Sequence, residues 1–356
     1  MKTIGVDLHA CSLTATAFDD QGEVVERRDI PTKCRRQAAA CFASSGSSCQ
    51  VTVESVGFSQ WFWNDTRSHV DKFVLTDPAG VKSFVGRKAK TDRNDSRLLA
   101  KLLRADRLPM AYVPAESVRQ LRDLARLRHR VARTLASERR QLREVMLKNN
   151  LPGSSVLTSD RSPKWLLAPP HHLRVPNRLA AEMRLDHITR LERDVTEPGR
   201  HIGKAGKADP ELDRQARLIA SVPGIGKLIA ATILTERGDR TRFKNIDPFG
   251  ASAGLAPTVS QSGESIRHGH IAKRGSPVLR WILQQAAWVA IRSDLYVRSI
   301  FARIGKRAGP KKTATAIAIA RKLLAYAWSV SRHGAPFLWP GESAPPNLSD
   351  HWSYEI

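Results

Sequence analysis

The first hundred residues alternate short apolar runs with turn residues, a pattern that predicts strands joined by tight connections. We expect strands at residues 3–7, 13–18, 23–30, 50–54 and 72–76. The sequence DDQG at residues 19–22 is typical of a turn and predicts an antiparallel hairpin in front. Residues 92–103 place leucines along one side of a helical pattern. The sequence therefore predicts an α/β domain over residues 1–110.

Residues 116–149 contain neither glycine nor proline and predict one long helix. Two apolar sets recur at multiples of seven: Val118, Ala125, Ala132 and Met146, and Leu121, Leu135 and Leu142. Such a heptad pattern, interrupted here by Arg128 and Arg139, is typical of a helix paired with another helix or another subunit. A second helix is expected over residues 178–196, followed by a linker rich in Gly, Lys and Pro. Residues 111–210 therefore form a predicted helical or coiled-coil middle with a linker.

The remainder reads as a mainly α C-terminal domain over residues 211–340, with a loose proline-containing tail at 341–356. Helices are expected at residues 212–220, 227–237, 280–293 and 313–332. Between the second and third of these, residues 256–277 are rich in Ser, Gly, His, Lys and Arg and are expected to form a loop.

The charge narrows the class of partner. Lys and Arg number 58 against 34 Asp and Glu, a net charge of +24, which predicts binding to nucleic acid or to an anionic membrane. The opening MKTIGVDLHA lacks the features of a signal peptide, and the apolar stretch 278–291 is too short to span a bilayer. The four cysteines fit no zinc or redox spacing. We expect a cytoplasmic nucleic-acid protein with no membrane partner.

Four carboxylates occupy positions that suggest a metal site: Asp7 and Glu54 end predicted strands, and Asp92 and Asp95 begin a predicted helix. The spacing of three residues puts Asp92 and Asp95 on one helical face. Oxygen ligands of this kind suit Mg²⁺, and two such ions can stabilise phosphoryl transfer. Alternatively, Asp92 and Asp95 are ordinary first-turn acids favoured by the helix dipole, and Glu54 is a surface residue.

Residues 218–234, LIASVPGIGKLIAATIL, match a helix–hairpin–helix pattern. Gly224 and Gly226 would let backbone N–H groups approach a phosphate, and Lys227 adds a charge at the start of the next helix. Such a hairpin positions nucleic acid without reading its sequence. The alternative is an ordinary tight connection between two helices.

The segment that follows, residues 253–275, combines hydroxyl groups with cations. A serine nucleophile acting on a phosphodiester needs nearby charges that stabilise the developing negative charge. Composition does not select one serine, and a basic loop that only touches phosphates remains an alternative. The residues concerned are Ser260, Ser262 and Ser265 among Arg267, His268, His270, Lys273 and Arg274.

Taken in order, these motifs resemble the DEDD transposases of bacterial insertion sequences, the group that includes the pilin-gene inverting recombinase. The similarity covers nearly the whole chain. Its marks are IGVD (Asp7), VES (Glu54), KTDRND (Asp92 and Asp95), SVPGIG at 221–226, DPFGASAGLAP at 247–257, SGESIRHGHIAKRGSPVLR at 262–280, and RKLL and HGAPF between 321 and 337.

The resemblance implies a ribonuclease-H-like (RuvC-like) fold for the first domain, with Asp7, Glu54, Asp92 and Asp95 binding Mg²⁺ or Mn²⁺. It further implies that a serine attacks DNA to form a transient phosphoserine, and the S-G-x-S-I-R motif points to Ser262. Members of the group are similar in pairing a noncoding guide RNA with the ends of the element and with target DNA. They also assemble as dimers and tetramers with composite sites, and such an enzyme would act at the bacterial nucleoid.

Two other functions fit parts of the sequence. A RuvC-like junction nuclease would use the same four acids with water as the nucleophile and would form no covalent intermediate. A noncatalytic nucleic-acid-binding protein would use the acids only to cap helices. The joint presence of all four acids in this order favours the recombinase.

Overall fold

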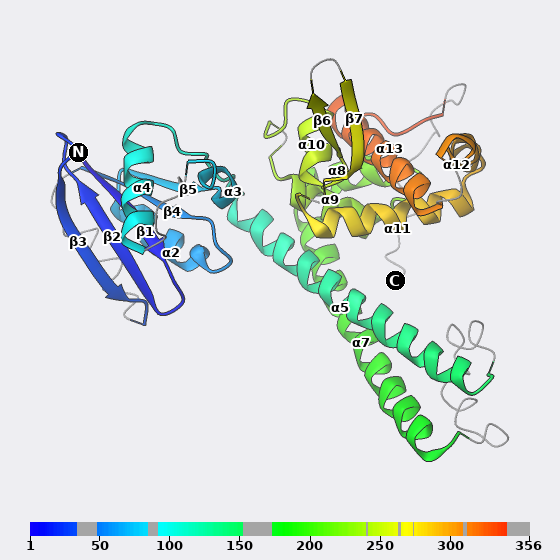
Figure 1. Cartoon of the computed structure of the whole chain (residues 1–356). Coiled ribbons are helices and arrows are strands. Elements are labelled where there is room, and N and C mark those ends of the chain that lie inside the picture. The colour runs from blue at the N-terminus through cyan, green and yellow to red at the C-terminus, as the bar shows by residue number, and fades with distance from the viewer. Residues whose placement is uncertain are drawn as a thin grey trace. The chain divides into compact units, whose positions relative to one another are not determined.

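The computed structural model describes residues 1–33, 48–84, 92–151, 173–239, 241–262, 265–272, 274–308 and 312–339 (Figure 1). Within these ranges the chain forms two compact units, Met1–Val113 and Pro114–Ile356. The described residues include no helix that is both long and apolar enough to cross a membrane.

The first unit is built on a five-stranded mixed sheet in the order β3-β2-β1-β4-β5. Strand β2 is antiparallel to both β1 and β3, whereas β4 runs parallel to β1 and β5 runs parallel to β4. The mixed α/β class expected for this unit is confirmed. The elements are β1 (Lys2–Leu8), β2 (Ser12–Phe18), β3 (Val24–Pro31), β4 (Cys49–Glu54), α2 (Ser59–Thr66), the 3₁₀ helix η1 (Arg67–His69), β5 (Lys72–Thr76), α3 (Pro78–Val81) and α4 (Asp92–Arg104).

The two faces of this sheet carry different helices because successive side chains of a strand point to opposite sides. Val6 and its neighbours on one face form the core with Phe62 of α2. The other face carries Gly5, which lies against the backbone of α4 at Ser96 and Ala100. Thr16, the register partner of Gly5, also hydrogen-bonds Ser96 on this face (2.8 Å between hydroxyl oxygens).

The second unit is mostly helical, and its elements follow α5 in chain order. They are α5 (Glu116–Lys148), α7 (Val175–Ala208), α8 (Pro210–Ala220), α9 (Lys227–Arg237), α10 (Ile246–Ser252), β6 (Pro257–Ser262), β7 (Ser265–Ile271), α11 (Pro277–Ser293), α12 (Leu295–Ala308) and α13 (Lys312–His333). Figure 1 shows α11 and α13 beside α8, α9 and α10, which enclose the largest apolar cluster among the described residues.

The long helix α5 pairs with α7 of the same chain (Figure 1). Their shared core contains heptad positions of the predicted pattern, Leu135, Leu142 and Met146, packed against Leu185 and its neighbours on α7. The first half of α5 instead contacts α9, where Arg126 donates two hydrogen bonds to Glu236.

The linker expected over residues 196–210 is not present, because α7 continues as a helix to Ala208. Pro198 lies inside this helix, where a proline removes one backbone hydrogen bond. Pro198 and Ile202 are both buried and extend the apolar stripe of Ile188 and Leu191 at helical spacing. The burial of Pro198 and Ile202 offsets the cost of the proline.

Candidate functional site

The first group of candidate residues lies where β1 and β4 end. Val6 and Val53 are register partners in parallel strands, so Asp7 and Glu54 follow them on one face of the sheet. This is the Gly5 face, against which α4 packs. Because α4 begins with Asp92 and Asp95, its acidic first turn approaches the end of β1. Three separate elements therefore contribute the four predicted carboxylates.

The structure brings Asp7 and Asp92 together through a residue that sequence reasoning did not select, His9. The His9 Nε2 atom lies 3.2 Å from Oδ2 of Asp7 and 3.4 Å from Oδ1 of Asp92. Each of the three residues offers one donor atom, and these atoms all lie within 4.8 Å of one another. The spacing D-x-H at the end of a strand could have indicated this pair, since residues two apart share a face.

The electrostatics of Asp7 reflect both burial and crowding. Burial of its carboxyl, which is 16% exposed, raises the pKa of Asp7 most, and the nearby charges of Asp92 and Asp95 raise it further, while His9 opposes them. Asp95 is therefore close enough to repel Asp7, although it is not one of the three residues whose donor atoms gather. Glu54 is half-buried at the adjacent strand end.

The second group is the connection between α8 and α9, which joins two helices through a turn as expected. Gly226 is the N-cap residue of α9 and Lys227 is its first residue. Gly224 has φ = +76° and lies against α11, where a Cβ would stand 2.3 Å from the carbonyl oxygen of Ala286. The structure thus gives Gly224 a packing role, whereas nothing in the described structure lies within 4 Å of where a Cβ of Gly226 would stand.

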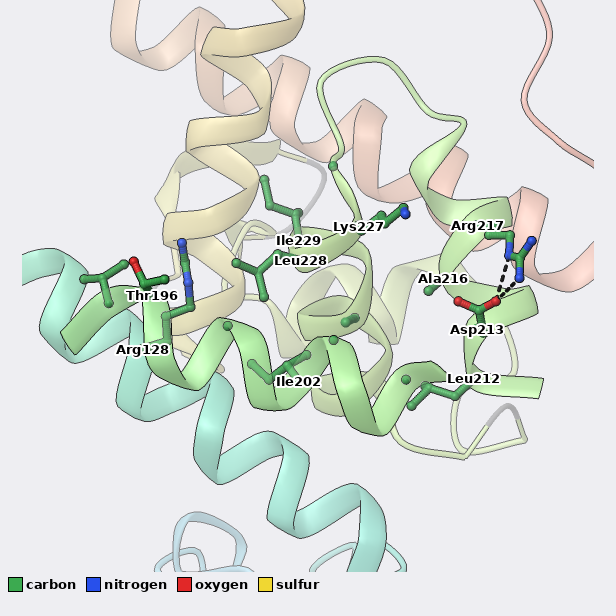
Figure 2. A pocket seen from close by; sticks show the side chains of 16 residues that line it. Arg128, Thr196, Ile202, Leu212, Asp213, Ala216, Arg217, Lys227, Leu228 and Ile229 are labelled. Carbon is green, nitrogen blue, oxygen red and sulfur yellow. Dashed lines mark hydrogen bonds and ion pairs between the residues drawn. The ribbon is translucent and has the colours of Figure 1, made fainter. Parts of the chain in front are cut away.

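A cavity of about 410 Å³ lies beside this connection, and Figure 2 shows the side chains that line it. Gly226 and Lys227 line it together with residues of α7 and α8, and Arg128 of α5 lies near Thr196. Arg217 pairs with Asp213 at the wall of the cavity. Burial lowers the pKa of Lys227, and the charges of Lys207 and Arg217 lower it further against the opposing effect of Asp213.

The third group contains the serines, and here the expected loop is wrong. Residues 257–262 and 265–271 form an antiparallel hairpin in which Ser262, the last residue of β6, is the register partner of Ser265. A connection of only two residues favours such tight pairing, but the abundance of Ser, Gly and His concealed the strands. Ser260, Arg267, His268 and His270 also lie on this hairpin. Only backbone is described for them and for Ser262 and Ser265. Arg274 is exposed, and Lys273 lies outside the described residues.

Comparison with known proteins finds two family models on this chain. Residues 4–150 match the DEDD transposase domain of the IS110 type, described as a transposase, and residues 216–302 match the transposase IS116/IS110/IS902 family. The first match spans the carboxylates, and the second spans the α8–α9 connection and the serine hairpin.

Several curated proteins are similar along most of their length. The transposase for insertion sequence element IS1328 of Yersinia enterocolitica is 26% identical over 341 residues, which are 94% of this chain and 98% of that protein. The pilin gene-inverting protein of Moraxella bovis is 26% identical over 276 residues, 76% of each chain. The transposase for element IS1111A of Coxiella burnetii is 23% identical over 296 residues, 82% of this chain and 78% of that protein.

Proposed function

We propose that this chain, which is a member of the IS110/IS116 transposase family, cuts and rejoins DNA strands through a serine nucleophile and a divalent-metal site. Its DNA transposase activity follows from the family; the serine, the metal ligands and the partners are the proposal. The observation that carries it is the convergence of Asp7, Asp92 and Asp95 at the end of β1, within a domain matched to DEDD transposases.

The residues present fit a divalent cation. The charges of Asp92 and Asp95 help to raise the pKa of Asp7, and a bound cation would offset that repulsion, while His9 offers one nitrogen donor to the same place. Asp7, Glu54, Asp92 and Asp95 would hold Mg²⁺ or Mn²⁺, which prefer oxygen ligands. When bound, such an ion neutralises charge on the scissile phosphate.

Ser262 would act as the nucleophile, by analogy with the family motif that its sequence matches. Its hydroxyl oxygen would attack phosphorus and form a phosphoserine ester, and the leaving strand would depart as a hydroxyl after taking up the proton that serine loses. Reversal with a different strand end would complete the exchange. Gly224, Gly226, Lys227, Arg267, His270, Lys273 and Arg274 would hold double-stranded DNA through its phosphates.

The partners extend this proposal. The resemblance supports element ends and target DNA as substrates, a noncoding guide RNA that pairs with both, and dimers or tetramers that act in the cytoplasm at the nucleoid. An RNA that carries the sequence information would leave the protein to read shape and backbone. The domain limits proposed for these roles remain 1–110, 111–210, 211–340 and 341–356.

A covalent-trapping assay tests the proposal. The full chain is mixed with Mg²⁺, the RNA transcribed from the flanking element and matching DNA, then denatured, and mass spectrometry locates any nucleotide adduct. We expect an adduct on Ser262 that Ser262→Ala and Asp7→Ala abolish and that Ser260→Ala retains. DNA cut without an adduct would support the junction nuclease instead, and no cutting under any RNA or metal condition would contradict catalysis altogether.

A further inference from the structure

A second cavity, of about 450 Å³, lies between α5, α11 and the base of the β6–β7 hairpin. It is lined by His129, Arg133 and Arg140 of α5, by Arg280 and Trp281 of α11, and by Ile271, the last residue of β7. Ile271 and Arg280 lie within the sequence motif at 262–280, but none of the six residues is among the site residues predicted from the sequence.

The charged residues that line this cavity are all basic. Arg133, Arg140 and Arg280 all line it, and no acidic residue is among its lining residues. Arg133 and Arg140 lie seven residues apart, so they project from one side of α5 two turns apart. Several guanidinium groups around one hollow favour an anion, and their planar forks suit phosphate oxygens.

His129 adds a hydrogen-bonding atom that lacks a partner. Its side chain is buried, with the residue only 6% exposed, and its ring meets the Trp281 ring edge-on at 5.0 Å between centroids. Within the described part of the chain, no hydrogen-bond partner lies within reach of the buried His129 Nδ1. Burial, then Arg133 and Arg130, lowers the pKa of His129, which keeps the ring neutral near pH 7. A neutral Nδ1 can either donate or accept a hydrogen bond.

An orphaned buried nitrogen costs free energy unless something in the cavity pairs with it. Whatever fills the cavity therefore has an anionic group for the arginines, a polar edge for His129 and a flat apolar part for Trp281. A nucleotide has all three. The volume falls within the range of sites for one small ligand and is too small for a duplex.

We propose that this cavity binds one unpaired nucleotide of the DNA strand held by the β6–β7 hairpin, with its phosphate on Arg133, Arg140 and Arg280 and its base against Trp281 and His129. The proposal rests on the proposed function, because DNA is chosen over other nucleic acid by the position of the cavity at the base of the serine hairpin. An enzyme that opens a strand must displace bases from the stack, and a pocket of this kind receives one of them.

The test compares two gapped duplexes that differ in a single position of the gap, thymidine in one and an abasic residue in the other, so that their phosphates are identical. Binding to the full chain is followed by fluorescence anisotropy. We expect wild type to bind the thymidine duplex about fivefold or more tightly than the abasic one, as base stacking on an aromatic residue implies. Trp281→Leu should remove this preference.

The arginines are tested with matched double variants on one helix. Arg133→Gln/Arg140→Gln removes two exposed charges at the cavity, whereas Arg143→Gln/Lys148→Gln removes two exposed charges of α5 that do not line it. We expect the first pair to weaken binding of both duplexes about tenfold or more, and the second pair to change it about threefold at most.

Three results would overturn the proposal. The two double variants could lose affinity equally, wild type could show no preference for thymidine over the abasic residue, or the preference could be seen only with RNA of the same sequence. The covalent-trapping assay separates this result from the proposed function. A Ser262 adduct formed by a protein without the thymidine preference would reject the cavity alone. A preserved preference without any adduct would reject the serine mechanism alone.

Discussion

Gly5 of β1 lies so close to Ser96 of α4 that a Cβ on Gly5 would stand 2.1 Å from the Ser96 carbonyl oxygen. The contact is with helix backbone, which has no rotamer to move aside. Asp7 lies two residues further along the same face, and α4 starts with Asp92 and Asp95. The absence of a side chain at Gly5 therefore determines how closely the helix brings its acids to the strand.

Gly5→Ala should therefore disrupt the arrangement of Asp7, Asp92 and Asp95, although Gly5 is not itself one of these carboxylates. The added methyl must push α4 off the sheet, and overpacking of this kind typically costs about 1–3 kcal/mol. We expect faster amide hydrogen exchange in β1 and α4 and loss of DNA cleavage. Gly57→Ala is the control, since nothing lies within 4 Å of where its Cβ would stand. Unchanged exchange in Gly5→Ala would show that the helix is not held against the strand in this way.

Removing the charge of Asp7 should stabilise the first unit in the absence of metal. Because burial and the neighbouring acids raise the pKa of Asp7 above its ordinary value of 3.8, the folded state holds its proton more tightly than the unfolded state. Stability then falls as pH rises through the interval between the two pKa values, and the penalty is complete above it. At pH 7 Asp7→Asn should therefore slow hydrogen exchange of β1 and α4, with no such gain at pH values below that interval.

Mg²⁺ should reverse this order of stability, so that wild type becomes more stable than Asp7→Asn. Addition of Mg²⁺ should protect β1 and α4 in wild type, because a ligand that binds only the folded state stabilises it, and should have little effect on Asp7→Asn. Asp106→Asn is a suitable control, since Asp106 is an exposed carboxylate of the same unit. Equal protection of wild type and Asp7→Asn by Mg²⁺ would place the ion elsewhere.

The elements that the sequence predicted correctly are those whose apolar positions follow directly from their packing. The central strands of the first unit are short apolar runs because both faces of the sheet are buried, and heptad positions of α5 are apolar because α7 covers them. The extension of α7 through Pro198 was missed, because burial of Pro198 and Ile202 outweighs a local signal that ends helices elsewhere. The β6–β7 hairpin was missed because pairing between two strands leaves no trace in composition.

The candidate site was predicted in part for the same reason. Asp7, Glu54, Asp92 and Asp95 were selected as element ends, and their mutual approach depends on strand register and on the close contact at Gly5, which single positions do not encode. His9 and the arginines of the second cavity were not selected. These residues form sites only because the fold brings together residues far apart in the sequence, such as His129 and Trp281.

The ion pair between Arg126 and Glu236 should contribute more to stability than other pairs on α5. Arg126 donates from Nε and Nη2 at 2.8 Å and 3.1 Å, and the Glu236 side chain is only 4% exposed. Arg126→Ala would leave a buried carboxylate without its partner, so we expect a loss of about 2 kcal/mol in the free energy of unfolding of the second unit, measured by urea denaturation.

Arg139→Ala provides the comparison, because Arg139 pairs with Glu192 where both side chains are about half exposed, at 45% and 47%. An exposed pair of this kind is expected to contribute about 0.2–1 kcal/mol. Arg126→Lys should recover part of the loss, since it restores a charge but not both hydrogen bonds. Similar losses in Arg126→Ala and Arg139→Ala would mean that Glu236 finds another partner.

Gly224 and Gly226 should respond differently to the same change, although both stand in the hairpin motif. Gly224→Ala places a methyl at φ = +76° and 2.3 Å from the Ala286 carbonyl oxygen, so it should destabilise the second unit by about 1–3 kcal/mol or more. Gly226→Ala meets no atom within 4 Å and should leave the urea midpoint of unfolding nearly unchanged.

DNA binding then distinguishes packing from phosphate contact. If the backbone at Gly226 approaches a phosphate, the methyl added in Gly226→Ala will hinder that approach and should weaken binding to duplex DNA several-fold. Lys227→Gln should also weaken binding and should lower its salt dependence by about one ion. Normal binding by Gly226→Ala would assign the whole motif to packing, because Gly224 already has a structural reason of its own: its place against α11 leaves no room for a side chain.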